Sequence, residues 1–281
     1  MLTSAPNQSS DEKRLFSGRK QDKGARSQPF KRTVSFVIPA YNEEKRIKIV
    51  LEDLCRLISI TGLDCEIIVS IDGNDGTQKI VEDMSEEYPF IRFAWSSERA
   101  GKGGAIRRVT DQLGKELTFL MDADGAVTAD QFLSLMELTS KYDVVIAERY
   151  SKSSNSIPTF RRLISRGFNL LVQASLALKV RDTQSGYKII RTDLFKKAIA
   201  KVGVTNTFFD ISLLFHLKRS GAKIVEAPVL YAHHPDSKFS PFAEILGQGV
   251  SLLAFLVKHS RFADRIPEFL VHFYRKMFRW I

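Results

Sequence analysis

Short apolar runs alternate with stretches of helical periodicity through the first 150 residues. Five runs rich in β-branched and aromatic residues are read as buried strands, and they cover residues 34–40, 65–71, 91–96, 117–121 and 144–147. Between them, apolar residues recur three and four positions apart, which predicts amphipathic helices over 42–58, 77–88, 101–113 and 129–141. This strict alternation indicates an α/β domain with a doubly wound, mostly parallel sheet.

Later segments interleave apolar faces with basic residues. They span residues 161–178, 242–257 and 266–281, and the last one combines Phe273 and Trp280 with Arg and Lys. Cationic helices with such faces are typical of a membrane interface, whereas most amphipathic helices pack on their own domain or on a partner subunit. For the last segment we favour the membrane, because its basic residues belong to no motif. No run reaches the ~18 apolar residues that a membrane span needs.

Composition adds a strong positive charge. The 281 residues carry a formal net charge of +10, and residues 1–32 hold eight Lys or Arg against three Asp or Glu. That stretch is poor in large apolar side chains and is expected to be a disordered basic arm. The charge suits anionic lipid head groups or phosphorylated substrates, and nucleic acid is not favoured because no groove-reading motif is present. Cys55 and Cys65 have no disulfide or zinc spacing, which indicates a reducing compartment.

Polar clusters follow three of the expected strands, at residues 39–44, 72–76 and 122–124. Because the carboxyl ends of parallel strands meet at one edge, these clusters together predict a site. Asp122 and Asp124 are one residue apart, so in an extended segment both point to one side and suit a hard cation such as Mg²⁺. The alternative for this pair alone is a solvated turn. Asp72, at a strand tip, is expected to bind a base or ribose, and Asp75 is expected mostly to cap a helix.

A glycine-rich turn opens the helix expected from residue 101. In Gly101-Lys102-Gly103-Gly104 the glycines allow close backbone approach, helix N–H groups face an anion, and Lys102 adds charge. Arg99 and Arg107 reinforce this anion-binding interpretation. The turn matches neither the P-loop nor the dinucleotide-binding pattern.

Five motifs in order carry a resemblance to a known family. They are Ile38–Glu44, Ile71–Thr77, Gly101–Arg107, Asp122–Ala126 and Arg181–Lys188. Together they resemble the family 2 glycosyltransferases of the GT-A fold, in the branch that makes dolichyl or polyprenyl phosphate sugars. The resemblance covers roughly residues 33–240, which are expected to be the catalytic domain between the basic arm of 1–32 and amphipathic membrane-interface helices in 241–281.

The resemblance implies a nucleotide sugar, a UDP- or GDP-hexose, bound along the strand tips. Asp122 and Asp124 would hold Mg²⁺ or Mn²⁺ at the diphosphate, stabilising the leaving group. A lipid phosphate would attack the anomeric carbon with inversion, and this anionic nucleophile needs no general base. The donor-binding residues implied are Pro39, Tyr41, Glu43, Asp72, Gly101, Lys102 and Asp122.

On the acceptor side, Arg149, Arg161 and Ser165 resemble residues that grip the acceptor phosphate, which the planar fork of Arg suits. Asp182, Gln184 and Ser185 resemble the segment that lines the sugar and the acceptor. Asp210 stands where relatives with a hydroxyl acceptor carry their base, and here an orienting or a structural role is expected. His233 and His234 are not expected to bind a metal together, because neighbours in an extended strand point opposite ways.

One departure bears on the sugar. Mannosyl members often have Gln two residues after the second Asp, and this chain has Ala126 there. The resemblance therefore favours glucose from UDP-glucose over mannose from GDP-mannose. A transferase with a hydroxyl acceptor and a nucleotide-binding protein without turnover remain the alternatives. Peripheral attachment to the cytoplasmic membrane face is expected, and assembly into a homo-oligomer is left open.

Overall fold

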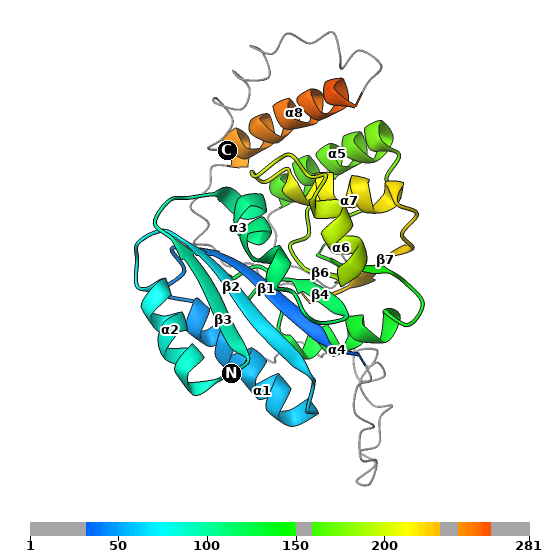
Figure 1. The fold of residues 1–281 in the computed structure, drawn as a ribbon. Helices are drawn as coiled ribbons and strands as arrows, with labels where there is room; N and C mark the ends of the chain where they lie inside the picture. The colour runs from blue at the N-terminus through cyan, green and yellow to red at the C-terminus, as the bar shows by residue number, and fades with distance from the viewer. Residues whose placement is uncertain (1–31, 150–158, 231–240, 260–281) are drawn as a thin grey trace, which may run out of the picture.

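A computed structural model describes residues 32–149, 159–230 and 241–259, without the side chains of 129–130, 159–165 and 241–246. In this part of the chain a seven-stranded sheet has the order β3-β2-β1-β4-β6-β5-β7, and helices cover both of its faces (Figure 1). The strands are β1 (Val34–Tyr41), β2 (Cys65–Asp72), β3 (Ile91–Ser96), β4 (Leu117–Leu120), β5 (Val144–Glu148), β6 (Lys188–Arg191) and β7 (Ile224–Pro228).

Two hydrophobic cores lie on opposite faces of the sheet. One core packs the sheet against α1 (Ile47–Thr61), α2 (Thr77–Glu87) and α4 (Ala129–Leu138). The other packs it against α3 (Gly101–Val109), α5 (Thr159–Leu176), α6 (Thr192–Ile199), α7 (Phe209–Arg219) and α8 (Pro241–Lys258). The central strands β1 and β2 are buried on both faces, which explains their continuous apolar runs.

One strand of the described sheet runs against its neighbours. β6 pairs antiparallel with both β4 and β5, whereas β1, β2, β3 and β4 pair in parallel. The chain therefore enters β6 at the edge where β4 ends. This direction brings residues 181–187 to the same edge as the loop that follows β4.

The expected α/β sheet is confirmed, and the five expected strands agree with the structure to within one residue. The helix expected from residue 42 begins at Ile47, and the one expected over 161–178 spans Thr159–Leu176. The sequence pattern did not predict β6, α6, α7 or β7. The basic arm, apart from Arg32, and the segment 266–281 lie outside the described residues. Within the described part, no helix has the length and apolar character needed to cross a bilayer.

Candidate active site

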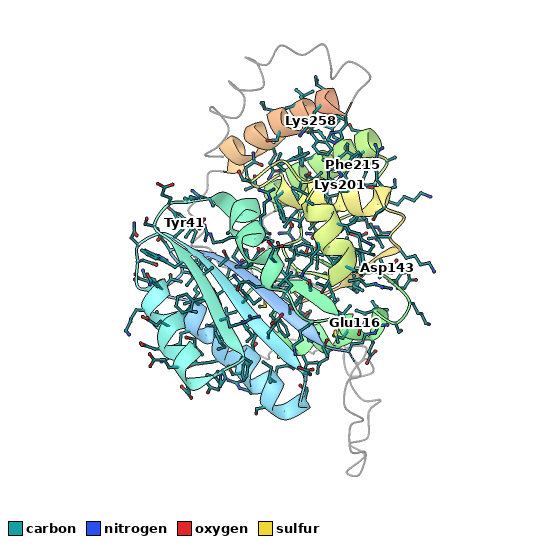
Figure 2. The ribbon with its side chains drawn as sticks, viewed as in Figure 1. Tyr41, Glu116, Asp143, Lys201, Phe215 and Lys258 are labelled. Carbon is teal, nitrogen blue, oxygen red and sulfur yellow. The ribbon has the colours of Figure 1, made fainter. Side chains whose placement is uncertain are left out.

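A cleft of about 670 Å³ opens at the carboxyl ends of β1, β2 and β3. Figure 2 shows Tyr41 at this end of the sheet, beside α3, and Glu116 at the opposite end. The guanidinium of Arg99 lies 4.3 Å from the centre of the Tyr41 ring, and Tyr41 is 42% exposed. The cleft thus offers an open aromatic surface and a cation, which suit a planar, anionic ligand. Its lining residues are Tyr41, Asn42, Gly73, Asn74, Asp75, Ser97, Glu98 and Arg99.

Three acidic residues of the strand tips form contacts within the protein. Asp72 is 2% exposed, and its two oxygens accept from the Ala100 N–H and the Arg108 guanidinium, both at 2.7 Å. Glu43 forms two hydrogen bonds with Arg46, at 2.7 and 2.9 Å. Asp75 accepts from Thr77 N–H at 3.0 Å, but it lies one residue before the N-cap of α2, which is Gly76.

Lys102 forms a salt bridge to two carboxylates of the site. Its ammonium lies 2.9 Å from Asp122 Oδ1 and 2.9 Å from Asp210 Oδ2. The other oxygen of Asp210 lies 2.7 Å from the ammonium of Lys188, which is fully buried. Negative and positive groups therefore alternate from Asp122 through Lys102 and Asp210 to Lys188, leading from the strand tips into the interior.

This alternation shifts the pKa values of its members. Burial opposes the charge of Lys102, but Asp122 and Asp210 outweigh burial and raise the pKa of Lys102 above its usual range. Burial also opposes the charge of Asp210, yet the two lysines hold the pKa of Asp210 below its usual range. Burial lowers the pKa of Lys188 despite its pairing with Asp210. Asp210 is therefore an ionised carboxylate and a weak base.

Asp124 is oriented by Tyr187. The Tyr187 hydroxyl donates to Asp124 Oδ1 at 2.8 Å, and the Ala126 N–H donates to the same oxygen at 3.0 Å. Burial is the main cause of the raised pKa of Tyr187, and Asp124 and Asp122 raise it further. Asp124 thus lies against the Tyr187 hydroxyl, and Asp122 lies against the backbone of the preceding Gly186.

Gly186 packs directly against Asp122. A β-carbon at position 186 would overlap all three atoms of the Asp122 carboxylate, so only glycine fits between this carboxylate and the backbone. Gly103 plays a similar part in α3, where a β-carbon would lie 2.6 Å from Val204 O and 2.7 Å from Phe209 Cδ2. The glycine at 103 thus lets α3 approach the segment before α7, a packing role that the anion-binding interpretation of the turn did not include.

Arg149 and Asp182 form a buried, two-point ion pair. Asp182 is 0% exposed and accepts from Arg149 Nε at 2.8 Å and from the second guanidinium nitrogen at 2.9 Å. Glu226, on β7, accepts the Arg181 and Asp182 N–H groups at 2.7–2.9 Å. Burial raises the pKa of Glu226.

Gln184 and Ser185 complete the segment that precedes β6. Gln184 Nε2 donates to Gln248 on α8, and the buried Ser185 hydroxyl contacts the backbone of Tyr187 at 3.3–3.4 Å. The backbone of Arg161 and Ser165 lies in α5, but their side chains, together with His233 and His234, lie outside the described residues. Pro39 is an interior residue of β1.

The structure thus brings together Lys102, Asp122, Asp124, Gly186 and Asp210, drawn from four separate parts of the chain. Sequence reasoning gave no role to Tyr187 and Lys188. These neighbours point to opposite sides, Tyr187 to Asp124 and Lys188 to Asp210. Two polar residues directly before the apolar pair Ile189 and Ile190 were the available signal.

Comparisons with known proteins find a matching family and relatives among the glycosyltransferases. The sequence profile of glycosyl transferase family 2 matches residues 35–199. A dolichyl-phosphate beta-glucosyltransferase of Trichomonas vaginalis is 30% identical over 218 residues, which are 73% of this chain and 67% of that protein. The glycosyltransferase AglD of Haloferax volcanii is 29% identical over 228 residues, 78% of this chain but 36% of AglD.

A solved structure shares the fold. The crystal structure of glucosyl-3-phosphoglycerate synthase from Mycobacterium tuberculosis, in complex with Mn²⁺, UDP and phosphoglyceric acid, superposes with a TM-score of 0.59. The alignment is 21% identical and covers 81% of this chain and 78% of that one. The similarity supports the expected α/β architecture of the GT-A type, and at this identity it carries the fold alone.

Proposed function

The chain belongs to glycosyl transferase family 2, and from that premise we propose that it moves a hexose from a nucleotide sugar to dolichyl phosphate or a related polyprenyl phosphate. The name of the Trichomonas vaginalis relative supports both the lipid acceptor and glucose as the sugar. UDP-glucose is the proposed donor, and Ala126 at the position of the mannosyl Gln favours it over GDP-mannose.

The cleft at β1–β3 is proposed to hold the nucleoside. Tyr41 offers a ring for a base to stack on, and Arg99 supplies a cation beside the same ring. Lys102, at the start of α3, is proposed to contact the diphosphate through its ammonium. Asp72 is proposed to act indirectly, because its contacts to Ala100 and Arg108 fix the turn that precedes α3.

The site fits a hard divalent cation. Asp122 already pairs with a cationic group, Lys102, and Asp124 is held at one oxygen by Tyr187 and Ala126. Among the described residues no group of three metal-ligating side chains occurs. Two carboxylates alone match Mg²⁺ or Mn²⁺, since substrate phosphates supply further ligands. When bound, such a cation would neutralise charge on the leaving diphosphate.

The observation that carries the proposal is the double pairing of Asp210. A hydroxyl acceptor needs a base to take its proton, and Asp210 stands where such relatives place theirs. Here both oxygens are bound to lysine ammonium groups, and the lowered pKa makes this carboxylate a poor proton acceptor. A phosphate acceptor is already anionic and needs none. Arg149, with Arg161 and Ser165 on α5, is proposed to bind that phosphate.

Membrane attachment is proposed for the side that carries α5 and α8. These helices pack against each other, and each exposes large aliphatic side chains: Leu170 and Leu171 on α5, Leu253 and Val257 on α8. Arg166 and Lys258 lie on the same two helices and suit anionic head groups. We propose peripheral attachment at the cytoplasmic face, with residues 33–240 as the catalytic domain and 241–281 as the region that meets the lipid.

Incubation of the full chain with polyprenyl phosphate and a panel of UDP- and GDP-hexoses, with and without Mn²⁺, tests the proposal. The expected result is Mn²⁺-dependent transfer of glucose from UDP-glucose to the lipid phosphate. Transfer of mannose from GDP-mannose, without transfer of glucose from UDP-glucose, would show that the proposed donor is wrong. Transfer to a glycan hydroxyl and none to lipid phosphate would overturn the proposed acceptor, and nucleotide binding without any turnover would overturn the enzyme.

A further inference from the structure

Helix α8 buries two polar side chains on its inner side. Gln248 and Ser251 are 5% and 1% exposed, and they share this side with Leu252 and Phe255, three and four residues apart. Burial of polar groups costs free energy unless they are hydrogen-bonded, so apolar packing alone does not explain their presence. Their hydrogen-bond partners therefore indicate what the inner side of α8 does.

Gln248 contacts the segment that precedes β6. Gln184 Nε2 donates a hydrogen bond to Gln248 Oε1. Two residues further along, Gly186 lies against the carboxylate of Asp122, and Tyr187 then donates to Asp124. A displacement of Gln184 would therefore be transmitted within three residues to both carboxylates.

Ser251 contacts a second segment of the site. Asn206 Nδ2 donates to Ser251 Oγ at 3.2 Å, and Asn206 Oδ1 accepts from the Phe208 N–H at 3.0 Å where α7 begins. Asp210 follows two residues later on α7. The neighbouring Thr205 O accepts from the Gly103 N–H at 3.0 Å, which ties the same segment to the start of α3.

The apolar residues of α8 fix the helix in place beside these bonds. Leu252 is 2% exposed, and the Phe255 ring lies 5.4 Å from that of Phe208 and 5.0 Å from that of Phe215. On the other side of the helix Leu253 is 64% exposed. One helix therefore has an inner side bonded to two segments of the site and an apolar outer side that faces solvent.

We propose that Gln248 and Ser251 are positioning residues, which align the segments 181–187 and 204–210 with the carboxylate pair. Helix α8 then completes the active site. This inference rests on the proposed function, in which the outer side of α8 meets the membrane that carries the acceptor. In this proposal, packing of α8 against the domain and alignment of the acceptor side of the site occur together.

The test compares full-length wild type with Gln248→Leu and Ser251→Ala, which keep the inner side filled. Hydrogen exchange is measured first, and it is expected to accelerate in residues 181–187 for Gln248→Leu and in 204–208 for Ser251→Ala, with β1–β3 unchanged. Steady-state kinetics with polyprenyl phosphate should show a loss of roughly tenfold in kcat/KM for the acceptor, since small displacements of positioning groups are costly. Affinity for UDP without metal, measured by calorimetry, should be unchanged, because the proposed nucleoside cleft is lined by the loops after β1, β2 and β3 and not by the two segments that α8 contacts.

Thr139→Val is the matched control. Thr139 is 6% exposed and donates locally to Met136 O at the end of α4, so this variant removes one buried hydroxyl far from α8. The acceptor kinetics of Thr139→Val, and its hydrogen exchange in residues 181–187, should equal those of wild type.

Unchanged exchange and unchanged acceptor kinetics in both α8 variants would overturn the inference. So would an equal loss of UDP affinity, acceptor kinetics and melting temperature, which indicates a purely structural role. If the wild type transfers no sugar to any polyprenyl phosphate, the proposed function fails, and the exchange measurements still decide whether α8 aligns the two segments.

Discussion

Gly186 lies so close to Asp122 that a β-carbon at residue 186 would overlap the Asp122 carboxylate. Asp122 is thereby fixed between the backbone at 186 and the ammonium of Lys102. The two contacts leave the Asp122 side chain 34% exposed and accessible to a ligand. The geometry of the proposed metal site therefore depends on a residue that has no side chain.

Gly186→Ala is expected to displace Asp122 and to lower kcat at least about 100-fold, because misplacement by an ångström has costs of this size. The free energy of unfolding should fall by about 1–3 kcal/mol from the strain. Turnover and urea unfolding measure the two effects. Gly167→Ala, on α5 with no atom within 4 Å of the new methyl group, serves as the control and should match wild type in turnover, with equal or slightly higher stability because alanine favours a helix interior. Near-normal activity in Gly186→Ala would contradict the close packing.

Asp124→Asn should remove a metal ligand and keep the fold. The amide oxygen can still accept from Tyr187 and Ala126, so stability should change little. Turnover should fall by about 10²–10³-fold, the usual cost of losing one electrostatic contact to a leaving group. Mn²⁺ binding, followed by electron paramagnetic resonance, should weaken in parallel, and chelation of the metal in wild type should have the same effect. Asp111→Asn, on an exposed residue, is the control.

Lys102→Met should separate metal binding from nucleotide binding. The ammonium competes with a metal ion for Asp122, so Mn²⁺ alone should bind more tightly to the variant. UDP should bind more weakly, by about 1–3 kcal/mol, because a charge-assisted contact is lost. Calorimetric titrations with Mn²⁺, and then with UDP, measure both. Weaker Mn²⁺ binding in the absence of nucleotide would show that Lys102 does not occupy the place of the metal.

The same variant should alter acid stability. Lys102 and Lys188 hold the pKa of Asp210 below its unfolded value, so this carboxylate stabilises the fold above the unfolded pKa, and the contribution is lost as pH falls through the folded pKa. Without Lys102 the folded pKa of Asp210 rises. Urea unfolding between pH 3 and 7 should show the acid loss of stability beginning at a higher pH than in wild type, and identical profiles would disprove the coupling.

Asp210→Asn should destabilise the fold by about 3–5 kcal/mol, since it leaves Lys188 buried without its carboxylate. Adding Lys188→Met should restore most of that stability. If Asp210 only positions Lys102, the double variant should retain activity within about tenfold of wild type, whereas loss of a general base costs about 10²–10⁴-fold. A stable but inactive double variant would favour a hydroxyl acceptor.

His216→Phe should remove a second source of acid sensitivity. Burial, together with His259, Lys201, Arg219 and Lys258, lowers the pKa of His216 to about 4 from 6.5. Between these values the unfolded chain binds more protons, so wild-type stability falls as pH decreases from 6.5 toward 4. The variant should lose less stability across this window, by roughly 1–2 kcal/mol after allowance for partial exposure. Thermal melts at pH 7 and pH 5 measure the difference, and equal slopes would contradict the shift.

The sequence predicted the sheet and the strand-tip clusters because both depend on local pattern. The runs that became β1 and β2 are buried on both faces, so their apolar residues are continuous and unmistakable. β6 has four residues and begins with Lys188, and β7 is only half-buried, so neither carries a strand signal of its own. The direction of β6 depends on its tertiary neighbours.

The role of a site residue could be predicted from the sequence only where its residue type allows few kinds of chemistry. The Asp122–Asp124 pair pointed to the centre of the proposed site only together with the other polar clusters at the strand ends, because the pair alone is also typical of a solvated turn. The partners of Asp72 and Asp210 were not predictable, since Arg108 and Lys188 reach them from elements distant in the sequence. Gln248 gave no signal at all, because its role appears only once α8 is packed against the loop before β6.

The antiparallel direction of β6 brings a late stretch of the chain to the edge of the sheet where β1 through β4 end. The donor-binding groups that we propose come from the loops after β1 through β4, whereas the segment that enters β6 comes from a later and continuous stretch of the chain. Because Gly186 and Tyr187 of that later stretch contact Asp122 and Asp124, an exchange of the stretch by recombination would also disturb the two carboxylates. A change of the proposed acceptor on this scaffold is therefore constrained by the carboxylates that the same stretch supports.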